Sequence, residues 1–273
     1  HECGVDRTKG EKGICRSGIL PVVASHTVHH GEEPPISGSH GSGTIFLTGC
    51  TGRCVFCQNY PISQLGTGKS VTESQLGDMM LDLQKRGCHN INFVTPTHFS
   101  PAIVSAVAYA AERGLRIPLV YNTSGYERCE VLKLLDGIID IYLPDAKYSN
   151  DKTARELSGF SDYTFFNASS LMEMYRQVGD IITHDGIAVR GLIIRHMILP
   201  GGLAGSGDIF RMIADKLSKD VHISLMDQYF PAYHANLHPT VSRRITEEEY
   251  EEAIELFEQS GLMNGWIQDH SEQ

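Results

Sequence analysis

Three cysteines, Cys50, Cys54 and Cys57, follow a short apolar segment at residues 44–47 in the pattern C-x3-C-x2-C. Two glycines between and before them free the backbone, so the thiolates can converge on one small object. Cysteine thiolates are the usual ligands of iron–sulfur clusters. Three thiolates on a cubane of four irons leave one iron open to the amino and carboxylate groups of a bound cofactor.

Zinc is the alternative metal that such a loop could bind. Three close cysteines with one of the 13 histidines would complete a structural zinc site, and ordinary buried thiols would need no ligand. Zinc sites more often show two separated C-x2-C pairs, and no second pair follows in this sequence. The pattern therefore favours the cluster, and a non-catalytic zinc-binding α/β protein stays as the competing hypothesis.

Composition points to a soluble globular protein of the reducing cytoplasm. The 273 residues are 41% hydrophobic and 21% charged, with a formal net charge of -10 and no long Lys/Arg run, which disfavours nucleic acid and anionic membranes as partners. Seven cysteines clustered mainly in one loop do not resemble a disulfide framework. We expect no membrane span, because no apolar run approaches the ~18 residues required.

The first 40 residues are rich in Gly, Pro and His and predict an irregular N-terminal extension with one hairpin. Cys3 and Cys15 lie in this extension and either belong to a second metal site completed by residues further upstream or are unligated thiols. The chain starts at His1 and not at a methionine, so upstream residues are expected. We assign residues 41–273 to one catalytic domain with a C-terminal helix.

From residue 43 onward, strands alternate with helices. Apolar runs predict six strands, and helical spacing with capping signals predicts the helices between them. The strands are expected at residues 44–47, 91–94, 118–121, 138–143, 189–199 and 221–226, and the helices at 76–83, 100–111, 131–135, 151–157, 165–178, 208–217 and from 247 onward. Thr72 with Gln75 and Thr246 with Glu249 match capping boxes, and Ser100 before Pro101 predicts an N-cap. The alternation predicts parallel βαβ units, in either a doubly wound sheet or a barrel.

Polar residues directly follow each of these strands, where a (β/α) barrel places its active site. After the cysteine loop come Thr95-Pro96-Thr97-His98, Asn122-Thr123-Ser124-Gly125, Pro144-Asp145-Ala146-Lys147, Arg195-His196 and Asp227-Gln228-Tyr229. These groups are the candidate lining of a site. Any one of them could instead cap a helix or end a strand.

The cysteine motif, with Phe56 as the aromatic residue of C-x3-C-x-aromatic-C, resembles the signature of the radical S-adenosylmethionine superfamily. The resemblance implies a partial (β/α)6 TIM-type barrel. It also implies a [4Fe-4S] cluster on Cys50, Cys54 and Cys57 that holds S-adenosylmethionine, cleaves it reductively and yields a 5′-deoxyadenosyl radical that abstracts hydrogen from a substrate. The resemblance further implies that the protein is an oxidoreductase of the cytoplasm that works under anaerobic conditions. It also implies a partner protein that supplies electrons, such as flavodoxin or ferredoxin.

Later segments resemble the pyruvate formate-lyase activating-enzyme group. Thr95-Pro96-Thr97 stands where that group has Gly-Gly-Glu, Asn122-Thr123-Ser124-Gly125 resembles its Asp-Thr-Asn-Gly, and Asp145-Ala146-Lys147 matches its Asp-Leu-Lys. The resemblance implies that the cofactor is positioned by a set of side chains that comprises Phe56, Thr95, Thr97, Asn122, Thr123, Asp145, Lys147 and Arg195. It further implies a monovalent cation held by Asn122, Thr123 and Asp145, although Asn122 carries no charge.

The substrate is left open by the sequence. A glycyl radical enzyme's glycine, another peptide side chain and a small molecule all fit an activating-enzyme-like protein. An RNA-modifying radical enzyme is a further alternative, which the net charge of -10 disfavours.

Overall fold

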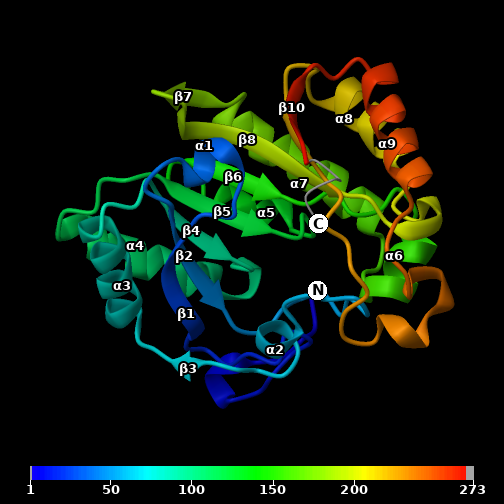
Figure 1. Cartoon of the computed structure of the whole chain (residues 1–273). Coiled ribbons are helices and arrows are strands. Elements are labelled where there is room, and N and C mark those ends of the chain that lie inside the picture. Colours follow the sequence, from blue (N-terminus) through cyan, green and yellow to red (C-terminus); the bar gives the residue numbers. More distant parts are fainter. Residues whose placement is uncertain (1, 269–273) are drawn as a thin grey trace.

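The computed structural model describes residues 2–268 and is built on a curved, mostly parallel sheet (Figure 1). Six strands lie side by side in chain order, and each is parallel to the next. They are β2 (Ser42–Leu47), β4 (Ile91–Val94), β5 (Leu119–Thr123), β6 (Ile141–Pro144), β8 (Ile187–Met197) and β9 (His222–Met226). These are the six predicted strands, and the sheet stays open as in a partial barrel, so the predicted α/β fold class is confirmed.

Helices cover the outer face of this sheet (Figure 1). The larger ones are α3 (Glu73–Lys85), α4 (Ser100–Glu112), α5 (Cys129–Lys133), α6 (Asp151–Ser158), α7 (Tyr163–Val178), α8 (Ser206–Lys216) and α9 (Glu247–Gln259). Short helical turns are α2 (Tyr60–Ser63), η1 (Arg7–Lys9), η2 (Thr97–Phe99), η3 (Pro200–Gly202), η4 (Ala235–Leu237) and η5 (Pro239–Val241). The core between helices and sheet contains residues such as Phe93, Tyr121 and Ile194.

The predicted capping boxes form at Thr72 and Thr246, where side chain and backbone bond reciprocally at the helix start. The N-cap predicted at Ser100 is wrong. Ser100 is the first residue of α4, and its hydroxyl donates to Thr97 O at 3.0 Å and lies 2.9 Å from the Tyr121 hydroxyl. A 3-10 turn runs directly into α4, so Ser100 already has helical backbone angles and cannot act as a cap.

Four strands extend the predicted set. β1 (Val22–His29) is antiparallel to β2 and to β3 (Lys69–Ser70), β7 (Ile182–His184) forms a hairpin with β8, and β10 (Asn264–Ile267) adds in parallel to β9. Strand β1, which lies within residues 1–40, therefore belongs to the same sheet as β2, the strand that precedes the cysteine loop. The division of the chain at residue 40 stays a prediction.

The turn α1 (Pro34–Ser37) lies on the inner face of the sheet, beside β6 and β8 (Figure 1). Ile36 is fully buried there among Val120 and Ile141, near the start of their strands, and Ile193, in the middle of β8. The Asn90 amide donates to Ile36 O at 2.7 Å and fixes this turn to the start of β4. Residues 31–37 therefore close the amino-terminal end of the barrel interior and place Glu32 and Glu33 inside it.

Among residues 2–268, none of the helices combines the length and the apolar character that crossing a bilayer requires.

Candidate functional site

The cysteine loop connects β2 to α2 at the carboxyl end of the sheet. Gly49 has a φ of 88°, and a Cβ there would lie 2.6 Å from Cys15 O, so glycine is required at the turn. Backbone bonds of 2.8 Å from Arg53 N to Ser158 O and from Val55 N to Leu157 O fasten the loop to the end of α6. The backbone of the loop is thus anchored to α6.

The three thiols of the loop are free and half-buried. Cys50 accepts from Gly52 N at 3.2 Å, Cys54 accepts from the Ser158 hydroxyl at 2.9 Å, and the Cys57 sulfur lies 3.1 Å from the Ser63 hydroxyl. Burial, together with the neighbouring Cys54 and Cys57, raises the pKa of Cys50 to about 12. Burial also raises the pKa of Cys54, against the charge of Lys147.

A buried ion network joins the ends of β5, β6 and β8. Asp145 accepts from Lys147 Nζ at 2.6 Å and from Arg195 Nε and Nη2 at 2.9 and 2.8 Å. Arg195 Nη2 also donates to Asn122 Oδ1 at 2.8 Å. Burial alone would raise the pKa of Asp145, but the charges of Arg195 and Lys147 hold that pKa below its ordinary value. Four of the predicted site residues therefore form one connected group.

This network and the cysteine loop line one cavity of about 210 Å³, whose walls include Cys54, Phe56 and Cys57 as well as Asp145, Lys147 and Arg195. Phe56 is buried and packs edge-on against Tyr229, with ring centroids 5.4 Å apart. The loop after β9 closes over the site, because His234 N donates to Val55 O at 2.8 Å and the Gln58 amide donates to Gln228 O at 3.0 Å. Lys147 links the two halves, since its charge acts on both Cys50 and Asp145.

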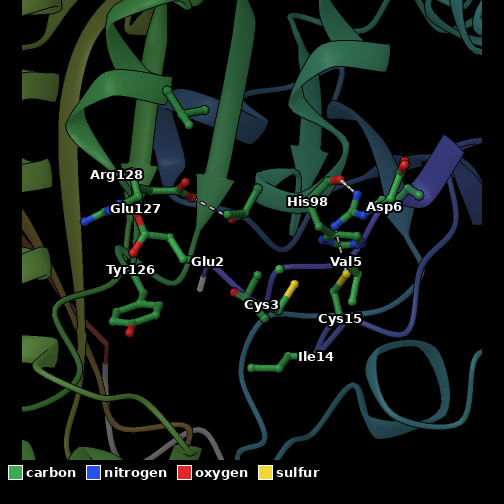
Figure 2. A pocket seen from close by; sticks show the side chains of 15 residues that line it. Glu2, Cys3, Val5, Asp6, Ile14, Cys15, His98, Tyr126, Glu127 and Arg128 are labelled. Atoms are coloured by element: carbon green, nitrogen blue, oxygen red, sulfur yellow. Dashed lines mark hydrogen bonds and ion pairs between the residues drawn. The ribbon is translucent and has the colours of Figure 1, made fainter. Parts of the chain in front are cut away.

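Thr97 and Thr123 do not line the cavity beside the cysteine loop. Their hydroxyls donate to Glu127 Oε1 at 2.6 and 2.5 Å, beside a second cavity of about 460 Å³ that the N-terminal segment covers (Figure 2). Burial raises the pKa of Glu127 to about 7, although both hydroxyls lower it. Thr95 has a left-handed backbone (φ 60°) at the end of β4, and its N–H donates to Asn122 O at 2.9 Å.

The three residues proposed to hold a cation already have hydrogen-bond partners within the protein. Arg195 and Lys147 already occupy the oxygens of Asn122 and Asp145, while Thr123 bonds to Glu127. The monovalent cation stays a prediction.

Cys3 and Cys15 both line the cavity of Figure 2, where Arg7 Nη2 donates to the Cys15 sulfur at 3.0 Å. Within residues 2–268, no three His, Cys, Asp or Glu side chains converge to hold one metal ion. This absence does not bear on the cluster expected at Cys50, Cys54 and Cys57. Each thiolate of a cubane binds a different iron, so the sulfur atoms stand further apart than the ligands of a single ion. The second metal site proposed for Cys3 and Cys15 stays a prediction.

Glu32, Asn92 and Glu127 are site residues that the sequence analysis missed. Glu32 lies 3.7 Å from Arg195 Nη1 and accepts from the Asn92 amide at 3.0 Å. Asn92 is fully buried within β4, where an amide among apolar residues was the available signal. Glu32 comes from the segment expected to be irregular, and Glu127 follows a strand end by four residues.

The residues present fit an iron–sulfur cluster. The donor set consists of three free thiols from one fixed loop, and the cavity beside them holds both acidic and basic groups. Both features match a cluster with one iron left for a zwitterionic cofactor.

Comparison with known proteins gives the family. The family model described as "Radical SAM superfamily" matches residues 44–201. The "Uncharacterized protein MJ0674" of Methanocaldococcus jannaschii is 33% identical over 273 residues, covering 96% of this chain and 74% of that protein.

The fold is similar to that of a solved structure. The FeFe-hydrogenase maturase HydG from Carboxydothermus hydrogenoformans aligns with a TM-score of 0.54 and 13% identity over 83% of this chain, which spans about half (52%) of that chain. A domain of pyruvate-formate lyase-activating enzyme from Bacteroides vulgatus ATCC 8482 aligns with a TM-score of 0.46 and 12% identity over 64% of this chain and 94% of that chain. The matched region spans the cysteine motif and the strand ends described above, and the chain belongs to the radical SAM superfamily, whose enzymes use a [4Fe-4S] cluster and S-adenosylmethionine.

Proposed function

We propose that this chain cleaves S-adenosylmethionine reductively at a [4Fe-4S] cluster held by Cys50, Cys54 and Cys57, and abstracts hydrogen from a substrate in the barrel. The observation that carries the proposal is the shared cavity. The fixed loop of free thiols and the Asp145–Lys147–Arg195 network line the same 210 Å³ space.

When bound, the cluster and S-adenosylmethionine supply an electron, a cleaved sulfonium and a carbon radical. The protein's part is to bind and orient. Lys147 and Arg195 would present cations to the methionine carboxylate, and Asp145 holds both cations in place. Both cations are buried and already oriented by Asp145, so little side-chain entropy is lost on binding.

The other predicted contacts act at the edge of this space. Phe56, fixed by Tyr229, provides an apolar wall for the adenine side. Asn122 orients Arg195, Thr95 turns the backbone at the end of β4, and Thr97 and Thr123 act through Glu127.

The proposal includes a substrate class and an electron donor. We infer an activating-enzyme-like role on a protein or peptide, with a reductant protein such as flavodoxin or ferredoxin supplying the electron. The net charge of -10 speaks against the RNA-modifying alternative. The zinc alternative predicts a colourless protein without reductase chemistry.

Anaerobic reconstitution tests the proposal. Wild-type protein should turn brown, bind about four irons and release methionine and 5′-deoxyadenosine from S-adenosylmethionine when dithionite is added. Cys57→Ala should lose the brown colour and this release. Cys129→Ala is the matched control, because Cys129 lies on α5 outside the loop, and it should keep both.

A colourless zinc-binding wild-type protein that leaves S-adenosylmethionine intact would overturn the proposal. Iron and zinc contents measured on the same samples separate this outcome from poor reconstitution, because a poorly loaded cluster protein contains neither metal in stoichiometric amount.

A further inference from the structure

A third cavity, distinct from the one in Figure 2, adjoins the cysteine-loop cavity inside the barrel. It measures about 510 Å³ and lies between residues 31–34, which close the barrel floor, and the strands β8, β9 and β10. Arg195, Met226 and Gln228 line both cavities, so the larger one lies next to the space beside the cysteines. We call this larger cavity the interior chamber. Its size suits an amino-acid side chain or a small metabolite.

The chamber is acidic. Glu32, Glu33 and Asp227 line it, and among the described lining residues Arg195 is the one cation. Arg195 is already engaged by Asp145 at 2.8 Å and Asn122 at 2.8 Å, and it reaches Glu32 at 3.7 Å. Its charge is therefore shared among several acceptors, and it acts on Glu33 as well as on Glu32.

Glu33 has a buried carboxylate oxygen without a hydrogen bond. The residue is 8% exposed, and its Oε2 atom has no hydrogen-bond partner among residues 2–268. A buried carboxylate oxygen without a donor is costly, because burial removes water without replacing its hydrogen bonds. Trp266, from β10, lines the same chamber, and cations are attracted to aromatic rings.

We infer that the interior chamber is the substrate site and that it binds a cationic amine, with the ammonium group on Glu33 and its alkyl chain directed toward the cysteine loop. The inference deepens the proposed function and rests on it for the chemistry, but amine binding is measurable by itself. The ammonium of a peptide lysine and that of a free alkylamine share this chemistry.

Calorimetric titration of the reconstituted protein with two isosteric probes tests the inference. Nα-acetyl-lysine amide should bind at least about tenfold more tightly than Nα-acetyl-norleucine amide, because a hydrogen-bonded charge on a buried carboxylate is worth that much. Pentylamine should likewise bind more tightly than 1-pentanol. Comparable affinities of the lysine probe and pentylamine identify a free amine, and much tighter lysine binding identifies a peptide. The chain has one tryptophan, so Trp266 fluorescence should change in the same titrations.

Glu33→Gln should reduce lysine-probe affinity about tenfold or more while leaving norleucine-probe affinity unchanged. Glu251→Gln, an exposed residue of α9, is the matched control and should not change either affinity. Equal binding of charged and neutral probes to wild-type protein overturns the inference, and this comparison stands even if Glu33→Gln fails to fold. Protein that cleaves S-adenosylmethionine but shows equal binding refutes the amine site alone. Absence of cleavage refutes the proposed function instead.

Discussion

Two buried carboxylates at neighbouring strand ends have opposite protonation behaviour. Asp145, after β6, accepts from Lys147 and Arg195, and these charges keep its pKa below the ordinary value despite burial. Glu127, beyond β5, accepts from the hydroxyls of Thr97 and Thr123, and burial raises its pKa to about 7. The difference teaches that burial alone does not set the charge of a carboxylate in this barrel. Its partners do.

The contrast also separates two kinds of cavity. The space beside the cysteines is bounded by fixed charges, which suit a zwitterionic cofactor. The cavity of Figure 2 has Arg7 and Arg128 in its wall as well, together with Glu127, a carboxylic acid that titrates near neutrality.

The largest expected effect comes from removing the Arg195 guanidinium, which neutralises Asp145. Arg195→Met should lower the free energy of unfolding by about 3–5 kcal/mol, because Asp145 and Glu32 would both lose a cation while still buried. Urea unfolding at pH 7.5 measures this. Adding Asp145→Asn should recover part of the loss. Arg176→Met, which removes an exposed arginine from its ion pairs, is the control and should cost far less. Equal losses in the two single variants would contradict the comparison.

Glu127 should make stability depend on pH in the opposite sense to Asp145. An unfolded glutamate titrates near 4.5, whereas Glu127 in the fold titrates near 7, so the folded chain holds one more proton between these values. Its stabilising contribution is present below pH 4.5 and is lost as the pH rises to about 7. Asp145, with a lowered pKa, loses its contribution as the pH falls below 3.8.

Glu127→Gln isolates this contribution. Between pH 4.5 and 7.5 the variant should lose roughly 3 kcal/mol less unfolding free energy than wild type. Glu32, whose burial also raises its pKa to about 7, leaves a remaining slope in the variant. Glu130→Gln changes an exposed neighbour and should follow wild type. Identical slopes for Glu127→Gln and wild type would show that Glu127 is ionised in the fold.

Local signals in the sequence predicted one half of this comparison and not the other. The cysteine spacing, the strand ends and the capping boxes at Thr72 and Thr246 are local patterns, and the structure contains each of them. The Asp145–Lys147–Arg195 network follows from strand ends because parallel strands bring their carboxyl ends to one edge.

Glu32 and Glu127 could not be predicted in that way. Glu32 enters the barrel through a turn whose Gly, Pro and His content indicates irregular chain, and its place depends on Ile36 packing across the sheet. Glu127 lies four residues past a strand, and its role depends on Thr97, from the turn that follows the neighbouring strand β4. β10 was missed for a similar reason, since four residues with one glycine carry little strand signal and pair through contacts distant in sequence.

The smallest expected effect sharpens the hydroxyl side of the comparison. Thr123→Val removes the 2.5 Å donor to Glu127 and should cost about 1–2 kcal/mol of unfolding free energy at pH 7.5. The cost should be smaller at pH 5, because a protonated Glu127 depends less on donated hydrogen bonds than a carboxylate does. Thr164→Val, which removes a 3.1 Å hydroxyl donor to the more exposed Asp151, is the matched control and should cost the same at both pH values. Urea unfolding of both variants at both pH values decides the point: if the Thr123 cost does not change with pH, hydroxyl donors do not control the protonation of Glu127, and burial alone would account for its raised pKa.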